Sequence, residues 1–103
     1  MTDMIARVWR ATTGTPERYR LVFEEEVLRE LGGVPGFRGA YLLARPRDGL
    51  TEIRTVTLFD SPQAVRRFAG EDWEREHVTP AARATLASSD PMIRHFTVLT
   101  EHR

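Results

Sequence analysis

Two histidines and one arginine are the side chains of this 103-residue sequence best suited to acid–base chemistry on a small molecule. His77 ends the charged run Glu74-Arg75-Glu76-His77, and His95 lies in an alternating segment near the end of the chain. An imidazole of near-neutral pKa can accept a phenolic proton or bind a metal, and Arg54 could stabilise the enolate or phenolate that forms. The competing interpretation of all three is an edge, surface or interface position without a chemical role.

Metal and cofactor chemistry has little support in the sequence. There is no cysteine, so thiolate nucleophiles and cysteine-based zinc or iron–sulfur sites are excluded. The spacing Glu74-x-x-His77 matches half of a carboxylate di-iron pair, but a second Glu-x-x-His is missing. The sequence also lacks a glycine-rich phosphate loop, a nucleophilic serine elbow and a metalloprotease motif. We therefore predict neither a metal nor a cofactor.

Aromatic residues are numerous enough to line a pocket for a flat substrate, because rings stack and bury area without demanding hydrogen bonds. The competing interpretation is that most of them simply fill the core of a small domain. Trp73 follows Gly70-Glu71-Asp72, where a helix end could open onto a cavity or carry a lid over the core edge. The residues predicted to contact substrate are Trp9, Phe23, Tyr41, Phe59, Phe68 and Trp73.

The charges of the chain cancel, with 15 Lys and Arg against 15 Asp and Glu. Without a global positive field, neither nucleic acid nor an anionic membrane surface is an expected partner. No apolar stretch approaches the roughly 18 residues of a spanning helix. The opening residues lack the basic and apolar segments of an export signal, so we expect a cytoplasmic protein.

The elements that must position these residues follow the order β-α-β-β-α-β. Strand patterns cover residues 4–13, 37–45, 51–59 and 92–100, and helical patterns cover residues 16–31 and 62–69. A further helix is expected from about Trp73 through Ala87, broken or restarted at Thr79-Pro80. This order predicts an α+β, ferredoxin-like fold, one domain over residues 1–103, with the helices on one face of a four-stranded antiparallel sheet.

Local signals mark where these elements begin and end. Thr15-Pro16 and Ser61-Pro62 each place a capping hydroxyl before a proline at the first helical position. Gly32-Gly33 is expected to end the first helix with one residue in the left-handed conformation. Asp48-Gly49 predicts a tight hairpin between the second and third strands.

The strands are apolar at both alternating sets of positions, so both faces of the sheet need cover. In the third strand, for example, Ile53 and Phe59 oppose Val56 and Leu58. Two or three short helices can cover only one face, and the economical cover for the other is a second copy of the sheet. We therefore predict a homodimer, with Ile53 or Ile93 as residues that could face the partner.

Three segments resemble the antibiotic-biosynthesis-monooxygenase-type domains of the dimeric α+β barrel superfamily. They are Pro35-Gly36-Phe37-x-Gly39, Leu58-Phe59-Asp60-Ser61-Pro62-Gln63-Ala64 and Phe68-Ala69-Gly70-Glu71-Asp72-Trp73. The resemblance spans nearly the whole chain and implies a homodimer with one pocket per subunit between sheet and helices. It also implies oxidation of aromatic polyketides or quinols by dioxygen without a metal or flavin, although many members of the family have no assigned activity.

Heme-degrading relatives offer another comparison. A histidine after the corresponding helix binds iron in those enzymes, and His77 falls near that position, with Phe68 near their tryptophan. The asparagine of their first strand is missing here, and Trp9 would crowd a porphyrin if it pointed into the pocket. Heme degradation is therefore disfavoured.

The leading hypothesis is a small cofactor-independent monooxygenase acting on an aromatic or quinol-type molecule. A base, His77 or His95, would generate a substrate carbanion that itself reduces dioxygen, with Arg54 stabilising the anion. The alternative is a non-catalytic domain, for binding or stress response, that sequesters a small apolar molecule. A polar cluster inside the pocket would favour the enzyme, and a closed, wholly apolar pocket would favour binding.

Overall fold

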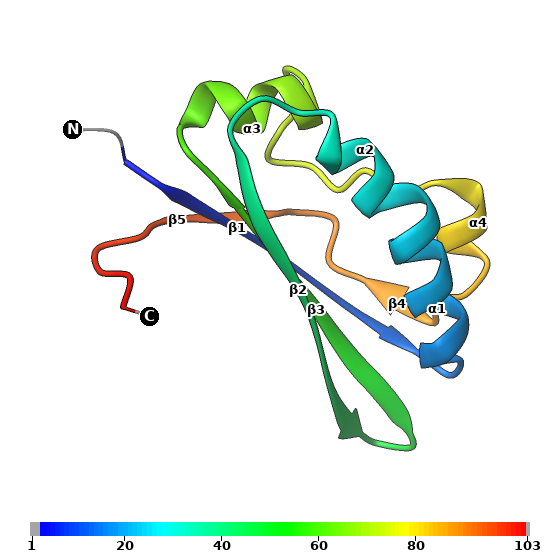
Figure 1. Ribbon diagram of the computed structural model, residues 1–103. Helices are drawn as coiled ribbons and strands as arrows, with labels where there is room; N and C mark the ends of the chain where they lie inside the picture. The colour runs from blue at the N-terminus through cyan, green and yellow to red at the C-terminus, as the bar shows by residue number, and fades with distance from the viewer. Residues whose placement is uncertain (1–2, 103) are drawn as a thin grey trace.

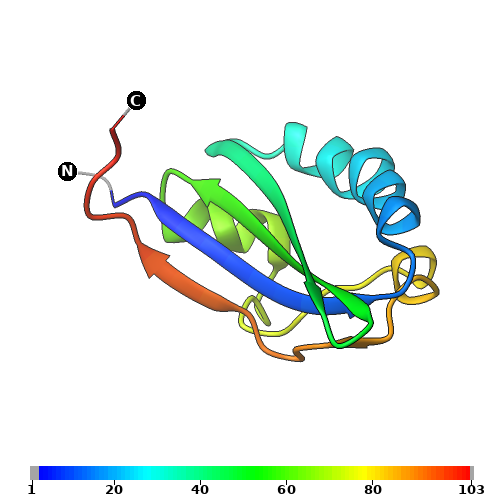
Figure 2. The same ribbon diagram turned by 90° about the horizontal axis from the view of Figure 1, so that it is seen from below.

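β1 (Ile5–Thr13) is the central strand of a twisted antiparallel sheet in the computed structural model, which describes residues 3–102 (Figure 1), because it has strand partners along both of its edges. The strand order is β2-β3-β1-β4. β5 pairs with the first half of β1, along the same edge of β1 to which β4 pairs near its end (Figure 2). The sheet is open rather than closed into a barrel. The strands are β1 (Ile5–Thr13), β2 (Phe37–Arg47), β3 (Leu50–Phe59), β4 (Ser88–Ser89) and β5 (Arg94–Thr97).

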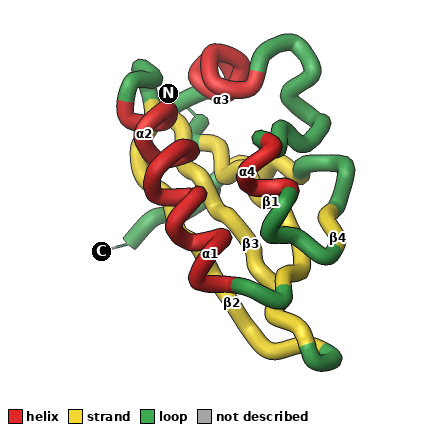
Figure 3. Tube along the Cα trace, turned by 90° about the vertical axis from the view of Figure 1, so that its right-hand side faces the viewer, coloured by secondary structure: helices red, strands yellow, loops and turns green. Residues whose placement is uncertain are grey.

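All the helices lie on one face of this sheet, as the sequence predicts (Figures 1 and 3). The first predicted helix is continuous, but its middle turn is a π-helix that the sequence pattern does not reveal. It comprises α1 (Pro16–Val22), η1 (Phe23–Val27) and α2 (Leu28–Gly32), and the other helices are α3 (Pro62–Ala69) and α4 (Pro80–Arg83). No helix within residues 3–102 is long and apolar enough to cross a membrane.

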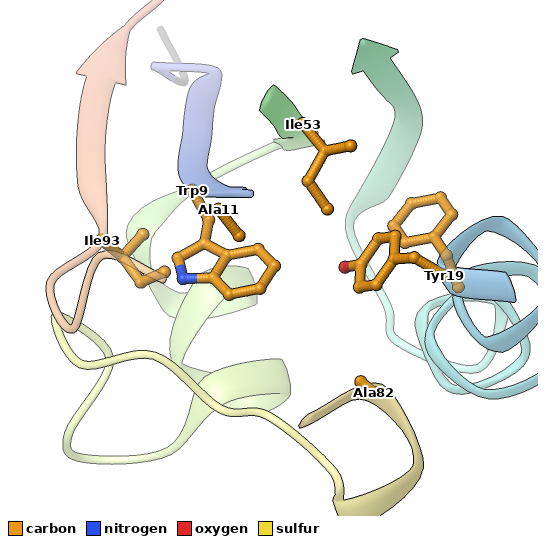
Figure 4. Close-up of a cluster of buried hydrophobic side chains, with 7 residues drawn as sticks. Trp9, Ala11, Tyr19, Ile53, Ala82 and Ile93 are labelled. Carbon is orange, nitrogen blue, oxygen red and sulfur yellow. The ribbon is translucent and has the colours of Figure 1, made fainter. Parts of the chain in front are cut away.

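The helix layer and the sheet enclose two adjoining groups of buried side chains. The first contains Trp9, Ala11, Tyr19, Phe23, Ile53, Ala82 and Ile93 (Figure 4). The second contains Ile5, Leu31, Phe59, Ala64 and Val65. Removing this apolar surface from water is the main driving force that holds the helices on the sheet.

Two of the four predicted local signals are confirmed. Asp48 and Gly49 both have positive φ, 50° and 80°, which is the backbone of a tight hairpin turn. The Ser61 hydroxyl caps α3 by accepting a hydrogen bond from the Ala64 N–H at 3.2 Å. The Thr15 side chain does not cap α1, although its carbonyl oxygen accepts the first helical hydrogen bonds. The prediction of a left-handed residue at Gly32-Gly33 is wrong, since Gly33 has a φ of −92°.

The predicted helix over residues 73–87 is wrong for most of its length, because only α4 is helical there. The irregular segment before it is held by distant contacts instead of helical hydrogen bonds. The Glu76 N–H donates to the Pro91 carbonyl oxygen at 2.9 Å, and the Ile93 N–H donates to the Glu74 carbonyl oxygen at 2.7 Å. The predicted fourth strand is likewise shorter, and β4 adds a fifth strand to the expected four.

The sheet face opposite the helices remains partly apolar. Tyr41, Leu43 and Phe96 lie there with 59%, 49% and 54% of their surfaces exposed. Ile53 and Ile93 instead point into the first core group, with 1% and 8% exposed. The expectation that one of these two isoleucines faces a partner is therefore wrong, because both are covered by the chain's own helix layer.

Candidate functional site

A small cavity of about 70 Å³ lies between the sheet and the helix layer. Its walls come from β1, β3, the continuous helix formed by α1 and η1, the segment from Phe68 to Ala82, and Ile93 just before β5. Aromatic and aliphatic side chains form most of the lining. The polar residues among them are Arg7, Tyr19, Thr55, Thr57, His77 and Thr79. The cavity therefore contains a polar cluster within an apolar enclosure.

A shallower depression of about 310 Å³ adjoins this cavity on its outer side. The two share five wall residues, namely Val27, Phe68, His77, Val78 and Thr79. Glu26 and Glu30 complete the depression. The shared residues thus lie between the inner cavity and the outer depression. We call this depression the acidic mouth because Glu26 and Glu30 line it.

Arg7 supplies the positive charge of the cavity. Because β1 alternates, Arg7 shares the helix-facing side of the strand with Ile5 and Trp9, and only 5% of its surface is exposed. Its Nη1 donates to the Trp73 carbonyl oxygen and lies 3.0 Å from His95 Nε2. No carboxylate of residues 3–102 forms an ion pair with it. Burial lowers the pKa of Arg7 to about 10, so the guanidinium stays charged at neutral pH.

His95 lies behind Arg7 rather than in the cavity wall. The two residues are register partners on β5 and β1, and the His95 ring packs on Trp73 with centroids 4.4 Å apart. Burial, and then the charge of Arg7, lower the pKa of His95 to about 4. The neutral imidazole can therefore accept a hydrogen bond from Arg7 through Nε2. His95 thus positions the guanidinium of Arg7.

Tyr19 places a phenol group in the same cavity. Its side chain comes from α1, and Figure 4 shows the hydroxyl directed inward, toward Trp9 and Ile53. Only 3% of the residue is exposed, and burial raises the pKa of its hydroxyl. Within residues 3–102, no protein group forms a hydrogen bond with that hydroxyl. A bound molecule could therefore take it as a donor.

Trp9 is fixed in the cavity wall by its indole nitrogen. Nε1 donates to the Asp90 carbonyl oxygen at 2.9 Å and to Glu76 Oε2 at 3.1 Å. Glu76 also accepts from Ser89 and Arg83. Burial alone would raise the pKa of Glu76, but the hydrogen bonds from Ser89, Arg83 and Trp9 outweigh it and lower the pKa. This network ties the irregular segment before α4 to the sheet.

His77 stands at the partition between cavity and mouth. It is exposed, lines both hollows and follows directly after the Glu76 anchor. A base in this position can touch a bound molecule on one side and pass a proton to water on the other. The structure thus brings His77 together with Trp9, Phe23 and Phe68 among the residues predicted from the sequence.

Arg54 lies on the opposite face of the sheet and does not contact the cavity. Its Nε donates to Glu52 Oε2 at 2.9 Å, and Arg45 and Arg47 donate to the same carboxylate. Hydrogen bonds from Arg47, Arg54 and Arg45 lower the pKa of Glu52 to about 2. These arginines cover the carboxylate so that only 2% of Glu52 is exposed, although they are themselves in contact with water.

The remaining aromatic residues predicted to contact substrate lie elsewhere. Phe59 is fully buried in the second core group, and Tyr41 is on the open face of the sheet. The Trp73 ring packs between His95 and the Arg66 guanidinium, whose carbon lies 5.1 Å from the ring centroid. Trp73 reaches the site only through its backbone oxygen, which accepts from Arg7.

Sequence reasoning did not select Arg7 or Tyr19. The signal for Arg7 was present, because its position has the same parity in the first strand as Ile5, Trp9 and Ala11. A charge at a core-facing strand position calls for either a buried partner or a ligand. Tyr19 belongs to the helical apolar stripe and carries no signal that distinguishes it from a core residue.

A larger groove of about 480 Å³ lies near the hairpin and β4, with Arg10, Arg47, Ser88 and Pro91 in its walls. It is broad and open to solvent, and no aromatic residue or histidine lines it. The smaller cavity is therefore the better candidate for chemistry on an aromatic molecule. Within residues 3–102, no three His, Asp or Glu side chains converge on a geometry that could hold a metal ion.

Comparison with family models and with curated proteins yields no match. Solved structures do match. A point mutant of SnoaB from Streptomyces nogalater, a cofactor-independent oxygenase, superposes with a TM-score of 0.68 at 21% identity, over 96% of both chains. The monooxygenase ActVA-Orf6 of Streptomyces coelicolor, solved with nanaomycin D, gives 0.60 at 20% identity, over 99% of this chain and 92% of that one.

The chain has the fold of these oxygenases. This confirms the fold class that the sequence resemblance implied. The designed protein Foldit4 also matches, with a TM-score of 0.60 at 19% identity over 92% of this chain and 98% of that one. A natural enzyme and a designed chain can share an architecture, so any chemistry must come from the residues in the cavity.

Proposed function

We propose that this protein is a cofactor-independent monooxygenase acting on an aromatic or quinol-type molecule held between sheet and helices. The observation that carries the proposal is Arg7, a buried cation without a carboxylate partner among residues 3–102, in a cavity lined by aromatic rings. A buried charge is costly unless something compensates it. An anionic substrate intermediate would provide that compensation.

In the proposed reaction, His77 removes a proton from the bound molecule, and Arg7 stabilises the resulting enolate or phenolate. The electron-rich anion then reduces dioxygen directly. For a substrate methylene between two aromatic groups, the overall change is CH2 + O2 → C=O + H2O. The substrate supplies all four electrons, one oxygen atom stays as the carbonyl, and the other leaves as water. Arg7 thereby takes the stabilising role that the sequence assigned to Arg54.

Access to the cavity requires movement of its outer partition. The inner volume of about 70 Å³ is too small for a polycyclic molecule, whereas binding pockets commonly enclose several hundred Å³. The adjoining depression provides about 310 Å³. We expect the ligand to extend through both spaces after Phe68 and His77 shift. His77 can shift because, within residues 3–102, the backbone N–H groups of residues 77–79 donate no hydrogen bond, in contrast to the anchored stretch 74–76 before them.

We also propose that the protein is a homodimer in which a second copy covers the open sheet face. The exposed Tyr41, Leu43 and Phe96 support this arrangement, because isolated proteins seldom leave several large apolar side chains together in water. An obligate interface buries ~2,000 Å² or more in total. At about 25 cal/mol per Å² of apolar area, the gross stabilisation amounts to tens of kcal/mol and exceeds the entropy cost of association.

A non-catalytic binding role is the alternative, but the polar cluster in the cavity supports the enzyme over it. Heme degradation has less support. The Trp9 indole occupies the cavity wall and is fixed there by two hydrogen bonds, which leaves no space for a porphyrin. Hemin mixed with the protein should give no Soret band that depends on His77.

Oxygen uptake tests the proposed function. Purified protein is supplied with a panel of quinols and polyhydroxylated aromatic compounds, and the spontaneous oxidation rate of each is subtracted. We expect protein-dependent uptake with at least one compound and a loss of about tenfold or more in His77→Ala, as for removal of a general base. Absence of uptake across a broad panel would favour the binding alternative. Uptake unchanged in His77→Ala would remove His77 from the mechanism.

A further inference from the structure

The hydrogen-bonding capacity of Arg7 is only partly used by the protein. A guanidinium has five N–H donors, and the hydrogen bonds of Arg7 within residues 3–102 are made by Nη1 alone. The guanidinium carbon also lies 5.9 Å from the centroid of the Phe68 ring, a cation–π contact that uses no N–H donor. Nε and Nη2 have no protein acceptor in that part of the chain, and Arg7 lines the cavity. The unused donors are therefore available to a molecule bound there.

The contact between Arg7 and His95 preserves the charge of the guanidinium. A carboxylate at that place would neutralise the cation, whereas the imidazole accepts a hydrogen bond and carries no negative charge. The Trp73 carbonyl oxygen fixes the same nitrogen from another direction. The cation is thus positioned by neutral groups, and the Tyr19 hydroxyl gives the cavity a second unpaired donor.

The mouth carries the opposite charge. Glu26 and Glu30 line the outer depression, and Glu26 is held in place by the Thr79 hydroxyl, which donates to Oε1 at 2.6 Å. Carboxylates at an entrance lower the local concentration of anions and leave neutral molecules unaffected. A ligand therefore meets negative charge first and positive charge at the end of its path.

We infer that the cavity selects a neutral weak acid, a phenol or an enol, and holds it as the oxyanion on the free donors of Arg7. A permanent carboxylate would also suit Arg7 but is disfavoured at the Glu26 and Glu30 mouth. A molecule that cannot ionise would leave the cation without an anionic partner. The proton lost on binding passes to His77 and then to water. This inference rests on the proposed function for its site, but it concerns binding and needs no oxygen chemistry.

The test uses 4-nitrophenol, whose phenolate absorbs visible light while its neutral form does not. The compound is titrated with protein at a slightly acidic pH, at which most of the free ligand is neutral. We expect a saturable rise of the phenolate band, so that the bound ligand ionises at a lower pH than the free one. The methyl ether 4-nitroanisole cannot ionise and should bind about tenfold more weakly or worse, the ratio expected for one charge-assisted hydrogen bond.

Variants test the role of the cavity and the role of the acidic mouth separately. Arg7→Met should abolish the phenolate band, whereas the surface variant Arg29→Met should keep it. Glu30→Lys should strengthen the binding of 4-nitrobenzoate several-fold, and Glu25→Lys, on the same helix but outside the depression, should not. Circular dichroism establishes that each variant is folded. If Arg7→Met does not fold, the comparison of nitrophenol with nitroanisole on the wild-type protein still decides the question.

Colourless binding of 4-nitrophenol, or equal affinity for its methyl ether, would overturn the inference. A phenolate band that survives in folded Arg7→Met would overturn it as well. These failures are distinct from failure of the proposed function. If bound 4-nitrophenol ionises but no compound gives oxygen uptake, the inference stands and the protein is a binding protein. If oxygen uptake occurs but bound 4-nitrophenol stays colourless, the proposed enzyme function stands and the inference is rejected.

Discussion

Arg7 Nη1 lies 3.0 Å from His95 Nε2, and this contact places a neutral imidazole beside a buried guanidinium. Because Arg7 can only donate, Nε2 of His95 has to accept, and the ring proton resides on Nδ1. The pair differs from an arginine–carboxylate pair in that the positive charge is oriented but not cancelled. The remaining donors of Arg7 can then act on a molecule in the cavity.

His95 should remain neutral down to acidic pH. Burial, and then Arg7, lower its pKa from 6.5 to about 4, so the unfolded chain binds this proton at higher pH than the folded chain. Protonation of His95 therefore favours unfolding, and its contribution to stability is complete above about pH 6.5 and declines as the pH falls toward 4. NMR titration of the imidazole measures this pKa. A His95 midpoint near 6.5 in the folded protein would contradict the contact with Arg7.

The Glu76 network should stabilise the segment that carries His77. Glu76→Gln removes the charge that accepts from Trp9, Ser89 and Arg83, and we expect a loss of about 1–3 kcal/mol in the free energy of unfolding. Tryptophan fluorescence should report the loosened indole of Trp9. The matched control is Glu74→Gln, because that carboxylate is exposed. Equal stability of the two variants would argue against an anchoring role.

Gly36 should tolerate no side chain. Its φ is +91°, and a Cβ atom there would lie 2.7 Å from the Ala64 Cβ at the start of α3. Gly36→Ala combines left-handed strain with overpacking, so we expect a loss of about 2–4 kcal/mol in urea denaturation. Gly39→Ala, with open space around the new atom, should cost less than about 1 kcal/mol. Similar costs at both sites would contradict the close approach of the turn before β2 to α3.

The homodimer predicts that a charge on the open sheet face weakens association. Phe96→Asp should raise the dissociation constant about thirtyfold or more, as expected when a charge replaces a large aromatic side chain buried in an interface. Leu21→Asp is a suitable control, since Leu21 is 52% exposed on the helix layer. Sedimentation measures both variants. A compact wild-type monomer at micromolar concentration would refute the dimer.

The architecture was predictable because its determinants are local. Proline after a capping residue, the Asp48-Gly49 turn and period-two alternation each act within a few residues and indicate element type. The segment from Trp73 to Val78 was not predictable in this way. Its charged residues are compatible with a helix, but backbone hydrogen bonds to Pro91 and Ile93 fix it in an irregular conformation. Such long-range contacts override local propensity.

The site was predictable only in part, for a related reason. His77, Trp9, Phe23 and Phe68 stand out by residue type, and the fold brings them together. Choosing between Arg7 and Arg54 requires knowing which sheet face the helices cover. The register pairs Arg7 with Thr57 on the helix side, whereas Arg54 pairs with Arg10 on the open side. Apolar residues on both faces hide that distinction in the sequence.

The central claim is that Arg7 is the arginine that stabilises the substrate anion. Oxygen uptake on the best substrate of the panel should be compared between Arg7→Met, Arg54→Met and Arg29→Met, with folding of each verified by circular dichroism. We predict that Arg7→Met loses about a hundredfold in kcat/KM, comparable to removal of one oxyanion-stabilising donor, while Arg29→Met retains the wild-type rate. Loss of uptake in Arg54→Met together with an unchanged rate in Arg7→Met would contradict the account.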